Sequence, residues 1–377
     1  MCDHRGYENR NEKYPARETY KGVTIQRVFS TGFGKGHPAA RLVDFLSFDL
    51  FLFLKLLRMP PFDVVISFTS PPMLGFLGAL FCRWRGGRVI QWLMDVNPDT
   101  AIRVGYVKEG SWLANGLNAL FRMTLEASDL VVVLDRWMKQ TVLSKGISPS
   151  RVIIVPPWSV VPTENIPPLS RDTGFRKKYG LENKFILLYS GNHSLVHPLD
   201  TILEAAVHLK DRTDVHFVFC GGGVRVADVR RVVAENNLKN VLQISAQSRE
   251  SYRDLLLSAD LHAIVMGNAM SGLSHLSKLY GILWTGRPYV FIGPSESHVG
   301  DTLRASPFGF RVSHGDVPDL LTVISLVKDF SDQDRERYRE GNTRYLKTTF
   351  QTSRALEELY LLLSAEDLRR EPAKLTG

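Results

Sequence analysis

Two short segments of the sequence combine glycine with polar side chains directly after apolar, β-branched runs. Glycine lets the main chain approach a ligand closely, and polar groups beside it can meet a phosphate or a sugar hydroxyl. Taken alone, each segment also fits an ordinary turn between a strand and a helix. The candidate ligand-binding residues are Gly191, Asn192 and His193 in the first segment, and Gly222 and Gly223 in the second.

A third segment places a cation at the predicted start of a helix. Ser277 is a reasonable N-cap, so the N–H groups there, its hydroxyl and the ammonium of Lys278 can meet one anion. Tyr280 follows, and His275 precedes them as a candidate sugar contact. Such donors would stabilise a departing diphosphate, because charge develops on the leaving oxygen. The alternative is a capped helix with a solvated lysine.

Two carboxylates, Asp95 and Asp99, follow a predicted strand in the first half. A carboxylate there can orient or deprotonate an acceptor hydroxyl, although a turn and N-cap pair is an equal alternative. The spacing also mimics the start of a calcium loop. Thr100 and Tyr106 occupy the positions that need glycine and glutamate, so calcium is not supported.

The elements that would position these residues follow a βα pattern, which predicts parallel sheets. In the first half we predict strands at 63–68, 88–94, 129–134 and 151–155, and helices at 72–85, 111–127 and 135–145. A proline-rich segment, 156–168, interrupts the pattern and is the predicted linker. In the second half we predict strands at 185–190, 215–220, 240–244, 261–265, 289–292 and 310–312, and helices at 199–210, 226–236, 251–258, 277–285 and 317–330.

The overall composition agrees with two globular domains. The chain has 377 residues, of which 44% are hydrophobic and 23% charged, and its three scattered cysteines exclude a disulfide framework. No signal peptide or membrane span is recognisable, so the expected location is cytoplasmic. Residues 1–164 hold 20 basic and 14 acidic side chains, or +6 of the total +8. This excess favours an anionic membrane surface over nucleic acid, for which no motif is present.

Two apolar segments could contribute to such a membrane contact. They are 45–57, and 73–82 with Arg83, Trp84 and Arg85 after it. A helix with a basic and aromatic end can dock on anionic lipid. Packing in the core, with arginines extending to water, explains the same residues.

The chemically interesting segments together resemble GT-B glycosyltransferases of family 4, particularly the group that builds colanic acid, O-antigen and other bacterial exopolysaccharides. The resemblance rests on the stretch 190–200, the Gly221 turn, and Ser277-Lys278-Leu279-Tyr280-Gly281 with Gly286-Arg287-Pro288. In the first half, Asp95-Val96-Asn97-Pro98-Asp99 is similar to that group's Asp-x-x-Pro-Glu segment. The similarity runs from about Val23 to the last helix.

The resemblance implies a GT-B fold, in which two doubly wound domains face each other across a cleft. It also implies retaining sugar transfer from a nucleotide diphosphate sugar to a lipid-linked or saccharide acceptor, without a metal or other cofactor. Lys278 would stabilise the leaving group, and Asp95 with Asp99 would face the acceptor. The implied donor site comprises Gly191, Asn192, His193, His197, Gly222, Gly223, Ser277, Tyr280 and Gly281.

The sequence departs from the family at several positions. Asn192 and His197 replace an arginine and a lysine, while Leu273 and Gly281 replace two glutamates. Lys278 is therefore expected to supply the main positive charge at the donor site. The exopolysaccharide group often shares these replacements, so they indicate a subgroup rather than inactivation.

We divide the chain into four parts: a polar, disordered or loosely docked segment, 1–22; an acceptor-side domain, 23–168; a donor domain, 169–350; and a helix within 351–377 that crosses back onto the first domain. The family's first strand and glycine turn are not recognisable, which indicates a late start codon or a remnant with an exposed sheet edge. The alternative function is therefore an inactive nucleotide-sugar binder. A nucleotide-sugar 2-epimerase is less favoured, because no cluster of carboxylates and histidines is identifiable.

Overall fold

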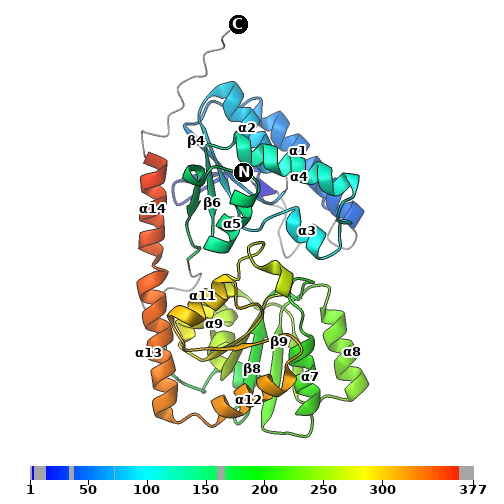
Figure 1. Cartoon of the computed structure of the whole chain (residues 1–377), viewed down its shortest axis with the longest axis vertical. Coiled ribbons are helices and arrows are strands. Elements are labelled where there is room, and N and C mark those ends of the chain that lie inside the picture. The colour runs from blue at the N-terminus through cyan, green and yellow to red at the C-terminus, as the bar shows by residue number, and fades with distance from the viewer. Residues whose placement is uncertain (1, 4–13, 34–37, 72, 159–165, 365–377) are drawn as a thin grey trace.

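The computed structural model contains two α/β domains stacked end to end, with a long helical segment running beside both (Figure 1). Loops at the carboxyl ends of strands in the two domains meet, because Asp95 of the first domain forms an isolated β-bridge with Ser274 of the second. The residues that the structure describes are 2–3, 14–33, 38–71, 73–158 and 166–364.

The first domain is built on a parallel four-stranded sheet with the order β4-β5-β6-β7. Its strands agree with the sequence prediction within two residues at each end. The strands are β4 (Val64–Phe68), β5 (Arg88–Trp92), β6 (Leu130–Val133) and β7 (Val152–Ile154). The helices are α1 (Pro38–Leu56), α2 (Leu74–Arg85), α3 (Asp99–Arg103), α4 (Trp112–Ala127) and α5 (Arg136–Ser144), followed by the short helix η1 (Pro149–Arg151).

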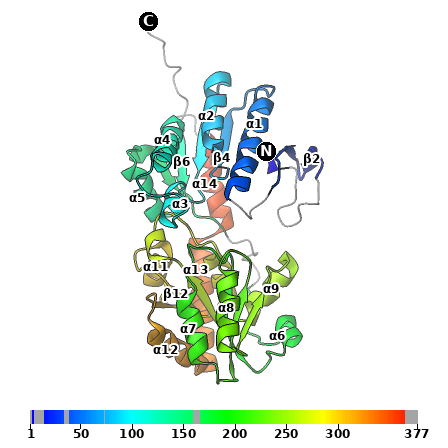
Figure 2. The same ribbon diagram turned by 90° about the vertical axis from the view of Figure 1, so that its right-hand side faces the viewer.

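A small sheet lies beside the first domain (Figure 2). It has the order β1-β3-β2, formed by β1 (Cys2–Asp3), β2 (Arg17–Tyr20) and β3 (Val23–Val28). Of the two alternatives predicted for residues 1–22, disorder is wrong for β2, which pairs antiparallel with β3 through a tight turn. Residues 1 and 4–13 of the predicted segment lie outside the described residues.

The second domain has a parallel six-stranded sheet with the order β10-β9-β8-β11-β12-β13. The chain moves outward through the first three strands and returns to the other side of β8, so the order reverses between β8 and β11. Ligands of doubly wound sheets bind at this switch point, beyond the carboxyl ends of the strands. The strands are β8 (Phe185–Ser190), β9 (Val215–Cys220), β10 (Val241–Ile244), β11 (Leu261–Val265), β12 (Tyr289–Ile292) and β13 (Phe310–Val312).

Helices cover both faces of this sheet, and most were predicted. The helices are α6 (Gly174–Tyr179), α7 (Asp200–His208), α8 (Val226–Asn236), α9 (Arg249–Ser258), α10 (Lys278–Thr285), α11 (His298–Ala305) and α12 (Val317–Lys328), with η2 (Asn268–Met270) between β11 and α10. Sequence analysis missed α6 and α11. In α11 the buried face includes His298 and Thr302, so it lacks a clean apolar pattern.

Two C-terminal helices connect the domains. α13 (Asp332–Thr349) packs on the second domain, where the Asn342 side chain donates to the Arg287 carbonyl over 3.0 Å. α14 (Thr352–Ser364) returns to the first domain, where the Leu363 carbonyl accepts a hydrogen bond of 2.7 Å from Arg88. Sequence analysis had not predicted α13, which is mostly polar. Its start is marked by a capping box between Ser331 and Asp334.

Among the residues that the structure describes, no helix is both long and apolar enough to cross a bilayer. The predicted apolar segment 45–57 lies in α1 and has two faces. Phe48 and Leu52 are buried, whereas Leu46, Leu50 and Leu54 are exposed. Core packing and an outward apolar surface therefore coexist on this helix.

Candidate functional site

Two glycine turns beside the switch point of the second sheet are hydrogen-bonded to each other. We call residues 191–193 and 221–223 the glycine cradle. The Gly191 N–H donates to the Cys220 carbonyl over 2.9 Å, and the His193 N–H donates to the Gly222 carbonyl over 2.8 Å. The two sequence-predicted segments thus form one surface at the carboxyl ends of β8 and β9.

The side chain of Lys278 lies against this cradle. Its Nζ atom is buried with no hydrogen-bond partner among the described residues and lies 4.2 Å from the centre of the Tyr189 ring. A Cβ atom at Gly191 would lie 2.7 Å from this Nζ, and Gly191 has a φ of +140°. A side chain at Gly191 would therefore strain the turn and displace the lysine.

Burial lowers the pKa of Lys278 to about 7, because desolvation disfavours the ammonium form. An anion placed beside the amine would reverse this effect. The site is therefore suited to bind a phosphate group that brings its own negative charge.

His193 lies inside the cradle and His197 is buried nearby. His193 Nδ1 lies 3.0 Å from the Gly191 carbonyl, while its buried Nε2 has no hydrogen bond of good geometry among the described residues, with the Gln243 side chain close enough to oppose part of the pKa shift. Burial, with a smaller effect from Lys278, lowers the pKa of His193. Burial, with a smaller effect from Lys278, also lowers the pKa of His197, to about 3. With Nδ1–H donating to the carbonyl, neutral His193 presents Nε2 as an acceptor for a hydroxyl.

Three further residues of the cradle are open to solvent. Asn192 is exposed, and its carbonyl accepts a hydrogen bond of 2.9 Å from the Tyr189 hydroxyl. Gly222 and Gly223 are exposed as well, and a Cβ at Gly222 would meet nothing within 4 Å. The structure thus brings together seven predicted residues: Gly191, Asn192, His193, His197, Gly222, Gly223 and Lys278.

Ser277 begins α10 but does not cap it in the predicted way. Its backbone has φ −60° and ψ −18°, which is helical, and its side chain makes no capping hydrogen bond. An N-cap residue normally has an extended conformation that directs its oxygen toward the helix N–H groups. Ser277 is nevertheless exposed beside Lys278, so its hydroxyl remains available.

Tyr280 and Gly281 do not reach the cradle. The Tyr280 ring is buried, and its hydroxyl lies 2.6 Å from His275 Nε2. Gly281 is buried in α10, where an added Cβ would lie 3.4 Å from Leu256 of α9. Both predicted donor contacts are therefore corrected to packing positions behind the site.

The two carboxylates predicted to face the acceptor differ in their surroundings. Asp95 lies at the contact with Ser274, and burial raises its pKa while a hydrogen bond from Ser274 opposes the shift. Asp99 is the first residue of α3 and accepts a hydrogen bond of 2.8 Å from Lys145. Asp95 therefore contacts the second domain, whereas Asp99 forms an ion pair within the first.

A buried polar cluster joins the domains and was missed by sequence analysis. Asp135 Oδ2 lies 2.7 Å from His275 Nδ1, and the His275 and His298 rings stack with centroids 3.8 Å apart. Both ring nitrogens of His275 are thus engaged, by Asp135 and Tyr280, and neither is free for the predicted sugar contact. The one sequence signal for this cluster was the position of Asp135 at the start of the predicted helix 135–145. The pairing itself joins residues too far apart in sequence to be seen.

The ligand atoms of Asp135, His275 and His298 lie within 4.8 Å of one another, as in some metal sites. Hydrogen bonding disfavours coordination in this arrangement. His298 Nε2 accepts from the Leu276 N–H over 3.1 Å, so neutral His298 carries its proton on Nδ1, which faces Asp135. The metal-independent chemistry suggested by the sequence remains a prediction.

Comparison with known proteins supports the resemblance. Residues 6–158 match the family model described as a glycosyl transferase 4-like domain. WcaI of Escherichia coli strain K12, assigned as a glycosyl transferase of colanic acid biosynthesis, is 26% identical over 247 residues. WbjE of Pseudomonas aeruginosa, assigned as a glycosyltransferase, is 23% identical over 265 residues. The matches cover 62% and 70% of this chain, and only 60% and 66% of the relatives' lengths.

Solved structures share the fold over nearly the whole chain. HepE of Anabaena, in complex with UDP and glucose, aligns over 90% of this chain and 86% of its own, with a TM-score of 0.67 and 12% identity. WaaG, which takes part in lipopolysaccharide biosynthesis, aligns over the same shares with a TM-score of 0.66 and 17% identity. Sucrose-phosphate synthase of Thermosynechococcus elongatus aligns over 96% and 87%, with a TM-score of 0.72 and 12% identity.

Proposed function

Because the chain contains a glycosyl transferase 4-like domain and has the GT-B fold, we propose that it transfers a sugar from a nucleotide diphosphate sugar. The donor binds in the second domain at the glycine cradle, and the acceptor binds on the side of the first domain. The buried Lys278 amine beside Gly191 carries this proposal, because it lacks a hydrogen-bond acceptor that a diphosphate would supply. No cofactor is required.

Lys278 contributes most to the proposed chemistry. As the bond between the anomeric carbon and the phosphate oxygen breaks, negative charge grows on that oxygen. A buried ammonium opposite this charge stabilises the transition state more than the ground state. The activation barrier of the transfer is therefore lowered. The exposed Ser277 hydroxyl donates to the same diphosphate.

The residues of the glycine cradle position the donor. His193 Nε2 accepts from a hydroxyl of the sugar, and the exposed Asn192 side chain binds the sugar or phosphate. Neutral histidine is required for the first contact, in agreement with the lowered pKa of His193. Leaving and attacking oxygens then share one face of the sugar, so transfer proceeds with retention of the anomeric configuration.

The acceptor is a lipid-linked or other saccharide of a cell-surface polysaccharide, on the cytoplasmic side of the membrane. The names of the relatives support this class. On the first domain, Leu50 and Leu54 of α1 are exposed, as is Trp84 at the end of α2, with the Arg85 guanidinium 3.9 Å above its ring. Apolar side chains beside arginines suit peripheral binding to anionic lipid.

Vesicle flotation tests the membrane proposal. The chain is expected to float with vesicles that contain phosphatidylglycerol and to remain at the bottom with neutral phosphatidylcholine vesicles. Replacing Arg83 and Arg85 by alanine should reduce flotation, whereas replacing Arg231 and Arg344 on the second domain should not. Equal flotation of both double variants would contradict the proposed surface.

Thermal denaturation with a panel of UDP-, GDP-, ADP- and dTDP-sugars tests the donor site. A ligand present at a hundred times its dissociation constant stabilises the folded state by about 2.7 kcal/mol. We expect a selective rise in melting temperature with one nucleotide class. A folded chain that responds to none would contradict the proposal. A rise without transfer or hydrolysis would favour the inactive nucleotide-sugar binder.

A further inference from the structure

One loop of the second domain is held by the first domain immediately before Lys278. We call residues 272–277 the bridging loop. The Leu273 carbonyl accepts a hydrogen bond of 2.8 Å from the Val96 N–H and a longer one, 3.4 Å, from the Thr100 hydroxyl. Ser274 pairs with Asp95 in the isolated bridge. The loop therefore takes its conformation partly from the first domain.

The bridging loop also packs directly on α5. Gly272 has a φ of +70°, and a Cβ there would lie 2.6 Å from Thr141 Oγ1 and 2.7 Å from the Trp137 carbonyl. Both values are below the closest approach of real Cβ atoms. Only glycine allows this approach, so the sequence is adapted to contact between the loop and the first domain.

The Asp135 carboxylate joins the N-terminus of α5 to the bridging loop. Its Oδ1 accepts from the N–H groups of Trp137 and Met138, at 2.9 and 2.8 Å, and so caps the helix. Its Oδ2 accepts from His275 Nδ1 at 2.7 Å. One buried side chain thus fixes both a helix of the first domain and a loop of the second.

The residues on both sides of Lys278 are held by this arrangement. The Tyr280 hydroxyl lies 2.6 Å from His275 Nε2, and the Leu276 N–H donates to His298 Nε2 over 3.1 Å. Lys278 lies between Leu276 and Tyr280 in sequence. A shift of the His275 ring therefore moves the start of α10, and the lysine with it.

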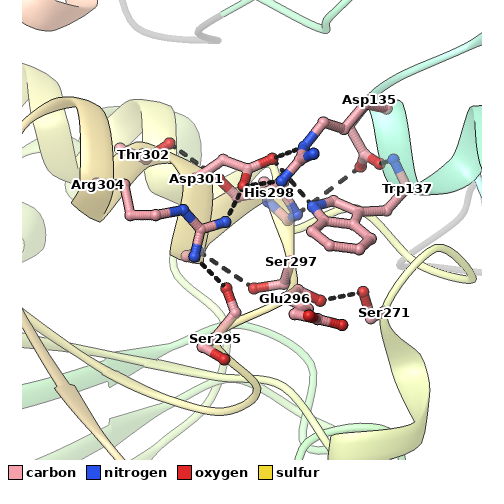
Figure 3. Close-up of polar contacts among 12 residues, drawn as sticks. Asp135, Trp137, Ser271, Ser295, Glu296, Ser297, His298, Asp301, Thr302 and Arg304 are labelled. Atoms are coloured by element: carbon pink, nitrogen blue, oxygen red, sulfur yellow. Dashed lines mark hydrogen bonds and ion pairs between the residues drawn. The ribbon is translucent and has the colours of Figure 1, made fainter.

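A second contact fixes α5 against α11 (Figure 3). Asp301 accepts from the Arg136 guanidinium at 2.5 and 2.8 Å and from Trp137 Nε1 at 3.0 Å. Arg304, on the same helix, also pairs with Asp301. Figure 3 shows Asp135 and Trp137 on one side of this contact and His298 and Asp301 on the other. The N-terminus of α5 thus carries the main polar contacts between the domains in this region.

We propose that Asp135 and His275 are positioning residues that place Lys278 at the donor diphosphate only while the two domains are in contact. This inference rests on the proposed function. It couples the binding of an acceptor by the first domain to cleavage of the donor in the second. When the domains separate, the bond between Asp135 and His275 is lost, the bridging loop relaxes, and the donor is protected from hydrolysis by water.

Replacing Asp135 by asparagine tests the proposal without removing the helix cap. Asparagine caps helices as well as aspartate does, but it has no charge to hold the His275 N–H. We expect kcat for transfer to fall about 10- to 100-fold, the range expected when a catalytic group moves by about 1 Å. The KM for the donor should change much less. Asp214→Asn, which removes an exposed carboxylate of the second domain, is the matched control.

Two replacements of His275 separate positioning from packing. The amide nitrogen of asparagine can take the place of Nδ1 and keep the bond to Asp135, whereas glutamine reaches the Nε2 position. If His275 positions Lys278 through its bond to Asp135, His275→Asn should retain a higher kcat than His275→Gln. A packing role predicts the opposite order, because glutamine is closer to histidine in volume. That opposite order, or an unchanged kcat for Asp135→Asn, would overturn the proposal.

Small-angle X-ray scattering and calorimetry separate this proposal from the function on which it rests. Titration of the wild-type chain with nucleoside diphosphates tests the donor site alone, and binding to none would refute the proposed function. Scattering tests the domain contact alone. We expect a larger radius of gyration for Asp135→Asn than for the wild type or Asp214→Asn, and identical scattering would overturn the coupling.

Discussion

The side-chain nitrogen of Lys278 lies 4.2 Å from the centre of the Tyr189 ring, with no carboxylate paired to it among the described residues. In its protonated form, a buried amine over an aromatic ring gains about 2 kcal/mol. The ring offers no acceptor for the N–H bonds, however. The contact therefore holds the lysine in place and leaves its hydrogen bonds to a ligand.

The lowered pKa of Lys278 predicts that diphosphate binding takes up a proton. Near pH 8 the buried amine, with a pKa of about 7, is mostly neutral, and a bound diphosphate raises that pKa by supplying negative charge. Calorimetry in buffers of different ionisation enthalpy should detect this uptake at pH 8 and much less of it at pH 6. The uptake should disappear in Lys278→Met. Equal uptake in the wild type and the variant would contradict the assignment.

The same shift predicts how stability depends on pH without ligand. In the unfolded chain this lysine is protonated below its ordinary pKa of 10.5. In the folded chain it is protonated only below its lowered pKa of about 7. Between these values the unfolded state binds more protons, so stability rises with pH. Thermal melting of the wild type should therefore improve relative to Lys278→Met between pH 7 and 10. A difference that stays constant with pH would contradict a neutral buried amine.

Gly191→Ala is expected to impair donor binding more than folding. The residue has a φ of +140°, and the new methyl would lie only 2.7 Å from Lys278 Nζ. Strain of this kind costs on the order of 1–3 kcal/mol, and displacement of the amine should weaken nucleotide binding at least tenfold. Gly116→Ala, where an added methyl meets nothing within 4 Å, is the control. Binding by calorimetry and melting by circular dichroism would measure both effects.

Asp95 and Asp99 are expected to differ in their effect on transfer. Asp95→Asn changes a carboxylate at the contact between the domains and should lower transfer to an acceptor by about 10- to 100-fold. Asp99→Asn breaks an ion pair with Lys145 inside the first domain. It should leave transfer within about threefold of wild type, because Asp99 is engaged by Lys145 and is not free to act on an acceptor. Equal losses in the two variants would refute the acceptor-side role of Asp95.

The fold was largely predictable because βα units leave a strong local pattern. The strands of both parallel sheets were recognised, and the two glycine turns belong to one surface because the carboxyl ends of β8 and β9 are adjacent. Lys278 was found for a similar reason, since a cation at a helix start is visible in sequence. These features depend on residues near one another in the chain.

The remaining features depend on tertiary contacts that no local pattern records. Tyr280 was assigned to the diphosphate, but its hydroxyl is used by His275, which in turn bonds to Asp135 of the other domain. Ser277 was assigned as a cap from its type. Its backbone conformation is instead helical. α11 was missed because its buried face packs polar groups such as His298 between the domains.

The second domain should depend strongly on a buried ion pair. Asp260 and Arg176 are both fully buried and 2.7 Å apart, and Asp260 also accepts from the Ile186 N–H at 2.8 Å. Asp260→Ala leaves the arginine unpaired and should cost about 3–5 kcal/mol. Asp214→Ala, at an exposed pair, should cost about 1 kcal/mol or less. Thermal unfolding would compare them, and similar losses would contradict the assigned importance of Asp260.

The most direct test of the proposed donor site is calorimetric titration of Lys278→Met with the nucleoside diphosphate that stabilises the wild type most. Methionine keeps the apolar stem and removes the charge. Loss of a buried charge-assisted contact costs about 2–5 kcal/mol, so the dissociation constant should rise at least about 30-fold. Lys347→Met, on the exposed surface of α13, should bind as the wild type does. Wild-type affinity in Lys278→Met would contradict the proposal that this lysine binds the donor diphosphate.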